Sequence, residues 1–210
     1  GAGGGAWRQG ARMEADRRCM EVAAGVLLAG GHAGAAWEAA VVAGELATVR
    51  RVGRHLPVMV EAAAAMGRED RIQELFTEVV HMPGVGGDRL ADWAAVFEKV
   101  GREELAKELW EAGLKQARDT ATLTPALAAG WARFLIRQKA FPAAESFLLA
   151  HDYLLTRELP EMLVELFTGW QRLGEMPVQV ARYRLASGIE KEVLWRAGVL
   201  NPNSDIGGTR

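Results

Sequence analysis

A turn signal recurs along the chain at a nearly constant spacing. Five positions carry it, 36, 34, 38 and 35 residues apart: Gly31, Gly67, Gly101, Lys139 and Gly174. In the two most similar stretches, a small or apolar residue lies five positions after the glycine and an aromatic residue nine positions after it. These residues are Ile72 and Phe76 in one stretch, Ala106 and Trp110 in the other. Self-similarity at such a period is the signature of a repeat protein whose unit is a helical hairpin.

Each repeat is expected to consist of helix A, a tight turn and helix B. Glycine suits the left-handed conformation that ends many helices, and breakers such as Thr124-Pro125 separate the repeats. No segment alternates with the period of two that a strand requires. Helices are predicted near residues 11–29, 34–50, 56–66, 69–81, 88–99, 102–117, 125–138, 142–155, 160–173, 177–187 and 189–199.

The predicted fold is all-α. It is a right-handed α-α superhelix (solenoid) of about five helix-turn-helix repeats plus a C-terminal capping helix. The repeats are expected to form one domain over residues 11–200, between a flexible leader (1–10) and a flexible tail (201–210). No secretory signal follows the glycine-rich start, so an intracellular, soluble protein is the expectation, with an organelle left open.

Composition excludes several classes of function. The 210 residues carry 25 Lys and Arg against 27 Asp and Glu, so the net charge is -2. This balance argues against nucleic-acid binding by bulk charge alone. The single cysteine, Cys19, cannot form an intrachain disulfide or a cysteine-rich zinc site, and it is expected to be a packed small hydrophobe. The longest apolar run is too short for a membrane span, so no membrane insertion is expected.

The frame resembles the tetratricopeptide repeat, or its close relative the pentatricopeptide repeat. The third unit resembles it best, with Trp93 and Phe97 in helix A, Gly101 in the turn, and Ala106 and Trp110 in helix B. The resemblance covers about residues 16 to 190 and implies a concave groove lined by the A helices. Family members that clamp acidic chaperone tails use Asn at set positions of helix A, and the base-reading code of pentatricopeptide proteins often uses Asn. The repeats here contain no Asn, so neither mode of binding is expected.

No catalytic, metal or nucleotide motif is complete. No two of the four histidines lie at ligand spacing on one helix face: His32, His55, His81 and His151. The Glu78-x-x-His81 pattern of di-iron bundles occurs once, whereas such a site needs it twice. The Gly-rich stretch 83–87 lacks the Lys and Ser/Thr of a phosphate loop. We therefore expect no enzyme, no cofactor and no metal.

The tryptophans of the repeats are expected to pack between helices, because Trp93 and Trp131 occupy equivalent positions, and Trp110 and Trp170 follow the same frame. Trp7 lies outside the frame and is a freer candidate for a partner contact. Trp37 and Trp195 fit either role.

The candidate partner-binding groove is basic toward its C-terminal half. The residue two positions before the turn is Ala in the first two repeats and a cation in the next three. The predicted groove residues are Lys99, Arg133, Arg137 and Arg172. They fit a peptide or protein segment with acidic side chains or a free carboxylate. A cation in the last helical turn is also favoured by the helix dipole alone, without any partner.

Three functions remain open. The first is a non-catalytic scaffold or adaptor that mediates protein–protein interaction through the groove. The second is a pentatricopeptide-like, RNA-associated component of a ribonucleoprotein or ribosomal assembly. The third is a helical-repeat domain of a larger secretion or envelope protein.

Overall fold

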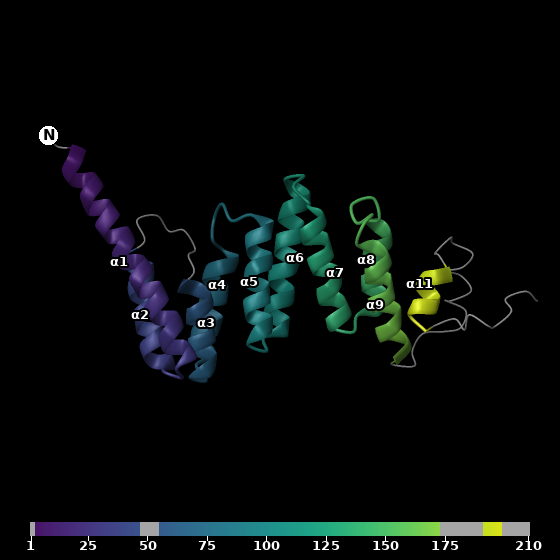
Figure 1. Ribbon diagram of the computed structural model, residues 1–210, viewed down its shortest axis with the longest axis horizontal. Coiled ribbons are helices and arrows are strands. Elements are labelled where there is room, and N and C mark those ends of the chain that lie inside the picture. The colour runs from purple at the N-terminus through teal and green to yellow at the C-terminus, as the bar shows by residue number, and fades with distance from the viewer. Residues whose placement is uncertain (1–2, 47–54, 173–190, 199–210) are drawn as a thin grey trace, which may run out of the picture. The chain divides into compact units, whose positions relative to one another are not determined.

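The computed structural model describes residues 3–46, 55–172 and 191–198, and every regular element within them is a helix. The described residues group into two units, Gly1–Ala117 and Arg118–Arg210. Figure 1 labels the helices: α1 (Gly3–Ala29), α2 (Ala33–Glu45), α3 (His55–Ala65), α4 (Glu69–Val80), α5 (Gly87–Lys99), α6 (Glu103–Asp119), α7 (Pro125–Arg137), α8 (Phe141–Ala150), α9 (Leu159–Arg172) and α11 (Lys191–Arg196). The helix predicted at 177–187 and the tail at 201–210 lie outside the described residues.

Four of the five predicted turns are described, and all four have the same left-handed conformation. The φ angles are 81° at Gly31, 65° at Gly67, 76° at Gly101 and 58° at Lys139. The fifth turn position, Gly174, lies outside the described residues. The one non-glycine turn therefore adopts a backbone conformation that L-residues disfavour, because the repeat requires it.

The hydrogen bonds of the four turns are also equivalent. After Gly101, for example, Arg102 N donates to Phe97 O at 2.8 Å and Gly101 N donates to Glu98 O at 2.9 Å. The same two bonds close the turns at residues 31, 67 and 139. This is the Schellman arrangement, which satisfies the last carbonyls of helix A. The helix-turn-helix repeat predicted from the spacing is confirmed at these four turns.

The side chains that follow each turn lock helix B onto helix A. The residue five positions after the turn is fully buried in all four repeats: Ala36, Ile72, Ala106 and Ala144. The residue nine positions after it is also buried: Ala40, Phe76, Trp110 and Leu148. Sequence spacing alone therefore identified the packed positions of helix B.

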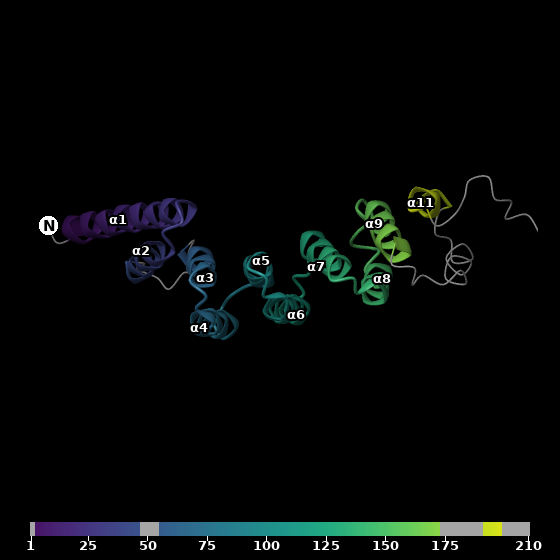
Figure 2. The same cartoon turned by 90° about the horizontal axis from the view of Figure 1, so that it is seen from below.

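In the first unit, α1, α2 and α3 pack against one another, and α3 also contacts α4 and α5 (Figure 2). The edge of one aromatic ring meets the face of another where α4 meets α5, with the centroids of Phe76 and Phe97 5.8 Å apart. Helices α5 and α6 approach closely at two glycines, because a Cβ added to Gly87 would lie 2.6 Å from the carbonyl oxygen of Gly113. Close backbone approach thus requires glycine at that crossing.

In the second unit, α7, α8 and α9 pack against one another and α11 packs on α9. The hydroxyl of Thr124 accepts a hydrogen bond from Leu127 N at 3.2 Å, which confirms the predicted N-cap of α7. Both carboxylate oxygens of Glu161 accept hydrogen bonds from Arg196 Nη2 at 2.8 Å, and these bonds tie α11 to α9. The capping helix predicted at 189–199 is thus described over the shorter range of α11.

The N-terminal region differs from expectation in two respects. Helix α1 begins at Gly3 rather than near residue 11, so it extends through residues 3–10 of the predicted leader. No proline interrupts this stretch, so the established helix continues through it, even though its four glycines are poor helix formers. Cys19 is exposed rather than packed, because α1 buries the opposite face, which carries the fully buried Ala24.

The tryptophans predicted to pack within the repeats are buried: Trp93, Trp110, Trp131 and Trp170. Trp37 is half-buried, and the guanidinium of Arg71 lies 4.4 Å from its ring centroid. Trp195 is 41% exposed, and the side chain of Trp7 is not among those described. Among the described helices, none combines the length and the apolar composition that crossing a membrane requires.

Candidate interaction surfaces

Lys99, the first predicted groove cation, pairs with a neighbouring A helix. It is the last residue of α5, and its Nζ lies 2.8 Å from Oε1 of Glu61 in α3. The lysine side chain is 69% exposed and the glutamate side chain 26% exposed. Because Glu61 already balances its charge, Lys99 links two consecutive repeats and offers less positive potential than its sequence position indicates.

A second ion pair connects the same two repeats next to their turns. The guanidinium of Arg102 donates to the carboxylate of Glu69 through both Nε, at 2.7 Å, and Nη2, at 2.5 Å. These hydrogen bonds hold the pKa of Glu69 below its usual value. Arg68 makes a similar contact within one turn and lowers the pKa of Asp70 to about 2. Charge pairs thus flank the turns at Gly67 and Gly101.

Two predicted groove cations lie together on α7. Arg133 and Arg137 are one helical turn apart, and both are exposed. Arg172 is the last residue of α9, and its side chain is not among those described. The structure therefore brings Arg133 and Arg137 onto one face of one helix, whereas Lys99 belongs to the other unit.

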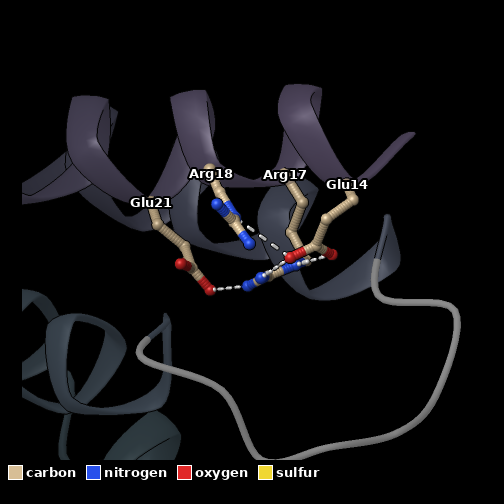
Figure 3. Close-up of polar contacts among 4 residues, drawn as sticks. All are labelled: Glu14, Arg17, Arg18 and Glu21. Carbon is tan, nitrogen blue, oxygen red and sulfur yellow. Dashed lines mark hydrogen bonds and ion pairs between the residues drawn. The ribbon is translucent and has the colours of Figure 1, made fainter. Parts of the chain in front are cut away.

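A cluster of charged side chains lies along α1 (Figure 3) and consists of Glu14, Arg17, Arg18 and Glu21. Sequence analysis did not predict this cluster. The guanidinium of Arg17 lies between two carboxylates, donating through Nε to Glu14 at 2.9 Å and through Nη1 to Glu21. Arg18 Nε adds a weaker contact to Glu14 at 3.2 Å. The hydrogen bond from Arg17 lowers the pKa of Glu14 to about 2, and it raises the pKa of Arg17. The i,i+3 and i,i+4 spacing of these charged residues could have predicted the cluster from the sequence.

His55, the first residue of α3, interacts electrostatically with Glu21 and Arg17 of this cluster. Its Nδ1 is buried and has no hydrogen-bond partner among the described residues. A Cβ added to Gly44 of α2 would lie 3.0 Å from the imidazole Nε2, so the ring packs directly on the α2 backbone. Burial lowers the pKa of His55, partly offset by Glu21 and Glu78, and Arg17 lowers it further.

The opposite face of α1 exposes apolar side chains. Val22 and Val26 are each 67% exposed and Cys19 is exposed as well. An open depression of about 630 Å³ lies along this face, lined by Arg18, Cys19, Val22, Ala23, Val26 and Leu27. The sequence contains a pattern that could have predicted this apolar face. Positions 15, 19, 22, 26 and 29 are spaced three or four residues apart and are all small or apolar.

No group of three or more His, Cys, Asp or Glu side chains that could hold a metal ion occurs among the described residues. His151 donates through Nδ1 to the carbonyl oxygen of Phe147 at 2.8 Å, and its ring stacks on that of Phe147. No known protein family, curated protein or solved structure matches this chain.

Proposed function

We propose that the chain is a non-catalytic helical-repeat scaffold of the tetratricopeptide type, whose repeats follow a right-handed superhelix. The repeated turn geometry and the buried positions of helix B support the proposal. Such arrays present their A helices as an extended binding surface. The partner is a protein or peptide segment that carries acidic side chains or a free carboxylate.

The observation that carries the proposal is the pair of exposed guanidinium groups on α7. Arg133 and Arg137 lie on the same face of an A helix, at the turn-proximal end where the repeat frame places groove residues. Two arginines one turn apart bind carboxylates through charge-assisted, two-pronged hydrogen bonds.

The first experiment is to tag the protein, isolate it from its own cells, and identify what co-purifies with and without ribonuclease. Partners that survive the nuclease support the scaffold. Partners that disappear together with recovered RNA overturn it in favour of an RNA-associated assembly. Binding to RNA also weakens steeply with added salt, because counterions are released on binding.

The second experiment tests the surface itself. The double reversal Arg133→Glu/Arg137→Glu is expected to weaken binding of the recovered partner by tenfold or more. The matched control is Lys107→Glu/Lys115→Glu, which makes the same change of net charge at exposed residues of α6, a B helix. Equal affinity of the two double variants for the partner would exclude the α7 surface as the binding site.

A further inference from the structure

The turn at residue 139 is the one described turn of the repeat that carries a side chain. Lys139 has a φ of 58°, and the three other described turns place glycine in the same left-handed conformation, with φ angles of 65–81°. A Cβ makes this conformation costly, so lysine destabilises a turn that glycine would form without that cost. Residues held in such conformations cluster at functional sites, where the side chain is used and the strain is tolerated.

The contacts of Lys139 give no structural reason for a lysine. Its side chain is exposed and forms no ion pair or hydrogen bond with another described residue. The turn is closed by backbone hydrogen bonds, which the amides of Lys139 and Ala140 donate at 3.0 and 2.9 Å. A cation also suits the negative end of the helix dipole, but Arg137 already supplies one in the last turn of α7. The fold therefore requires a turn at residue 139 but not a lysine.

Lys139 extends the positively charged surface of α7. Residues 125–144 contain three cations, Arg133, Arg137 and Lys139, and no carboxylate. The two arginines lie one turn apart, about 6 Å along the helix axis. Lys139 follows Arg137 by two residues, so their Cα atoms are at most about 7 Å apart, and the flexible stem of lysine extends the reach of its charge. All three side chains are exposed, so one extended acidic segment is long enough to meet all three charges.

We propose that Lys139 is a third binding residue of the α7 surface, retained despite its backbone cost because it contacts an acidic group of the partner. The inference rests on the proposed function, in which Arg133 and Arg137 bind carboxylates of the partner. It also narrows the class of partner. A single carboxylate held by the two arginines would leave the ammonium of Lys139 unpaired. The partner segment therefore carries at least two acidic groups in succession, such as neighbouring glutamates or an acidic residue beside a C-terminal carboxylate.

Fluorescence anisotropy tests the assignment with a labelled synthetic peptide that ends in a run of glutamates and a free carboxylate. The same peptide with glutamines and a C-terminal amide is the uncharged probe, and it is not expected to bind. Lys139→Gly and Lys139→Ala are both expected to weaken binding of the glutamate peptide by about threefold to fivefold, the size of one solvent-exposed charge contact. Lys139→Arg keeps a cation and is expected to retain the wild-type affinity.

Stability measurements separate a binding role from damage to the fold. Lys139→Gly removes the disfavoured conformation, so it is expected to be the more stable protein and the weaker binder. Ala121→Gly is the matched backbone control, because Ala121 has a φ of 53° and belongs to the same unit. It should gain stability with no change in peptide affinity. Arg157→Gln is the matched charge control, since it removes one exposed cation from the segment before α9 and should also leave the affinity unchanged.

Three results overturn the inference, and they differ in what they mean for the proposed function. If Lys139→Gly and Lys139→Ala bind the glutamate peptide as tightly as the wild type, while Arg133→Glu/Arg137→Glu weakens binding by about tenfold, the α7 surface binds without Lys139. An equal loss of affinity in Arg157→Gln shows that net charge governs binding rather than Lys139. If the wild type does not bind the glutamate peptide at concentrations up to about 1 mM, the inference fails together with the acidic partner of the proposed function.

Discussion

The turn at Lys139 offers a direct test of the repeat frame. Lys139 has a φ of 58°, in the conformation that glycine adopts at the three other described turns. Its exposed side chain has no structural reason to be lysine, since the turn is closed by backbone hydrogen bonds from Lys139 N and Ala140 N. Replacing Lys139 by glycine is therefore expected to stabilise the protein.

The size of the effect follows from two opposing contributions. The left-handed conformation costs an L-residue about 1–2 kcal/mol. Glycine loses more backbone entropy on folding, which costs roughly 0.5–1 kcal/mol. With both contributions at the middle of their ranges, the net stabilisation of Lys139→Gly is about 0.75 kcal/mol. With a urea dependence of about 2 kcal/mol per M, the midpoint should rise by about 0.4 M.

The assay is urea unfolding followed by the fluorescence of the tryptophans, of which Trp131 and Trp170 report on the same unit. Lys139→Ala is the control, because it removes the charge but keeps the disfavoured conformation, and its midpoint should match the wild type. Gly101→Ala is the reverse test. A Cβ there meets no atom within 4 Å, so the expected loss of about 1 kcal/mol comes from the backbone alone. A midpoint of Lys139→Gly at or below that of the wild type would refute the reasoning.

Three further predictions follow from the described contacts. Gly87→Ala is expected to lower the free energy of unfolding by about 1–3 kcal/mol, because the added Cβ would lie 2.6 Å from the backbone carbonyl oxygen of Gly113. Urea titration measures the loss, and Gly86→Ala, where the added Cβ meets open space, is the comparison. NMR titration should place the carboxyl pKa of Asp70 at about 2, and Arg68→Ala should return it toward about 3.9. The pKa of His55 is lowered in the folded chain, so the unfolded chain binds the proton first and stability falls as the pH drops below 6.5; His55→Phe should flatten this dependence in melting temperatures measured between about pH 7.5 and about pH 5.5.

Local rules were enough to predict the helical hairpins. A glycine after an apolar helical stretch is a local signal for a left-handed C-terminus, and five repetitions of it set the frame for the rest of the chain. The frame then identified buried positions such as Ala106 and Trp110, since equivalent residues of stacked repeats meet equivalent neighbours. Even Lys139 was placed correctly, because the period required a turn there.

Contacts between repeats were beyond the reach of the sequence. The pairs Lys99–Glu61 and Arg102–Glu69 join residues more than thirty positions apart, and their geometry depends on how one hairpin stacks on the next. Cys19 was misplaced for the same reason. A small apolar residue in an apolar helix is buried only where another element covers it, and periodicity alone does not say which face of α1 has a neighbour.

The closed hydrogen bonding of the turns has a consequence for how such a chain changes length in evolution. Each turn satisfies its carbonyls within six consecutive residues, so no turn depends on a donor from another repeat. Duplication or loss of one whole period leaves every remaining turn chemically complete. A gain or loss of a single residue inside a hairpin instead rotates all later side chains of that helix by about 100°, away from the core. Chains of this architecture are therefore expected to differ in length by whole hairpins rather than by single residues within a helix.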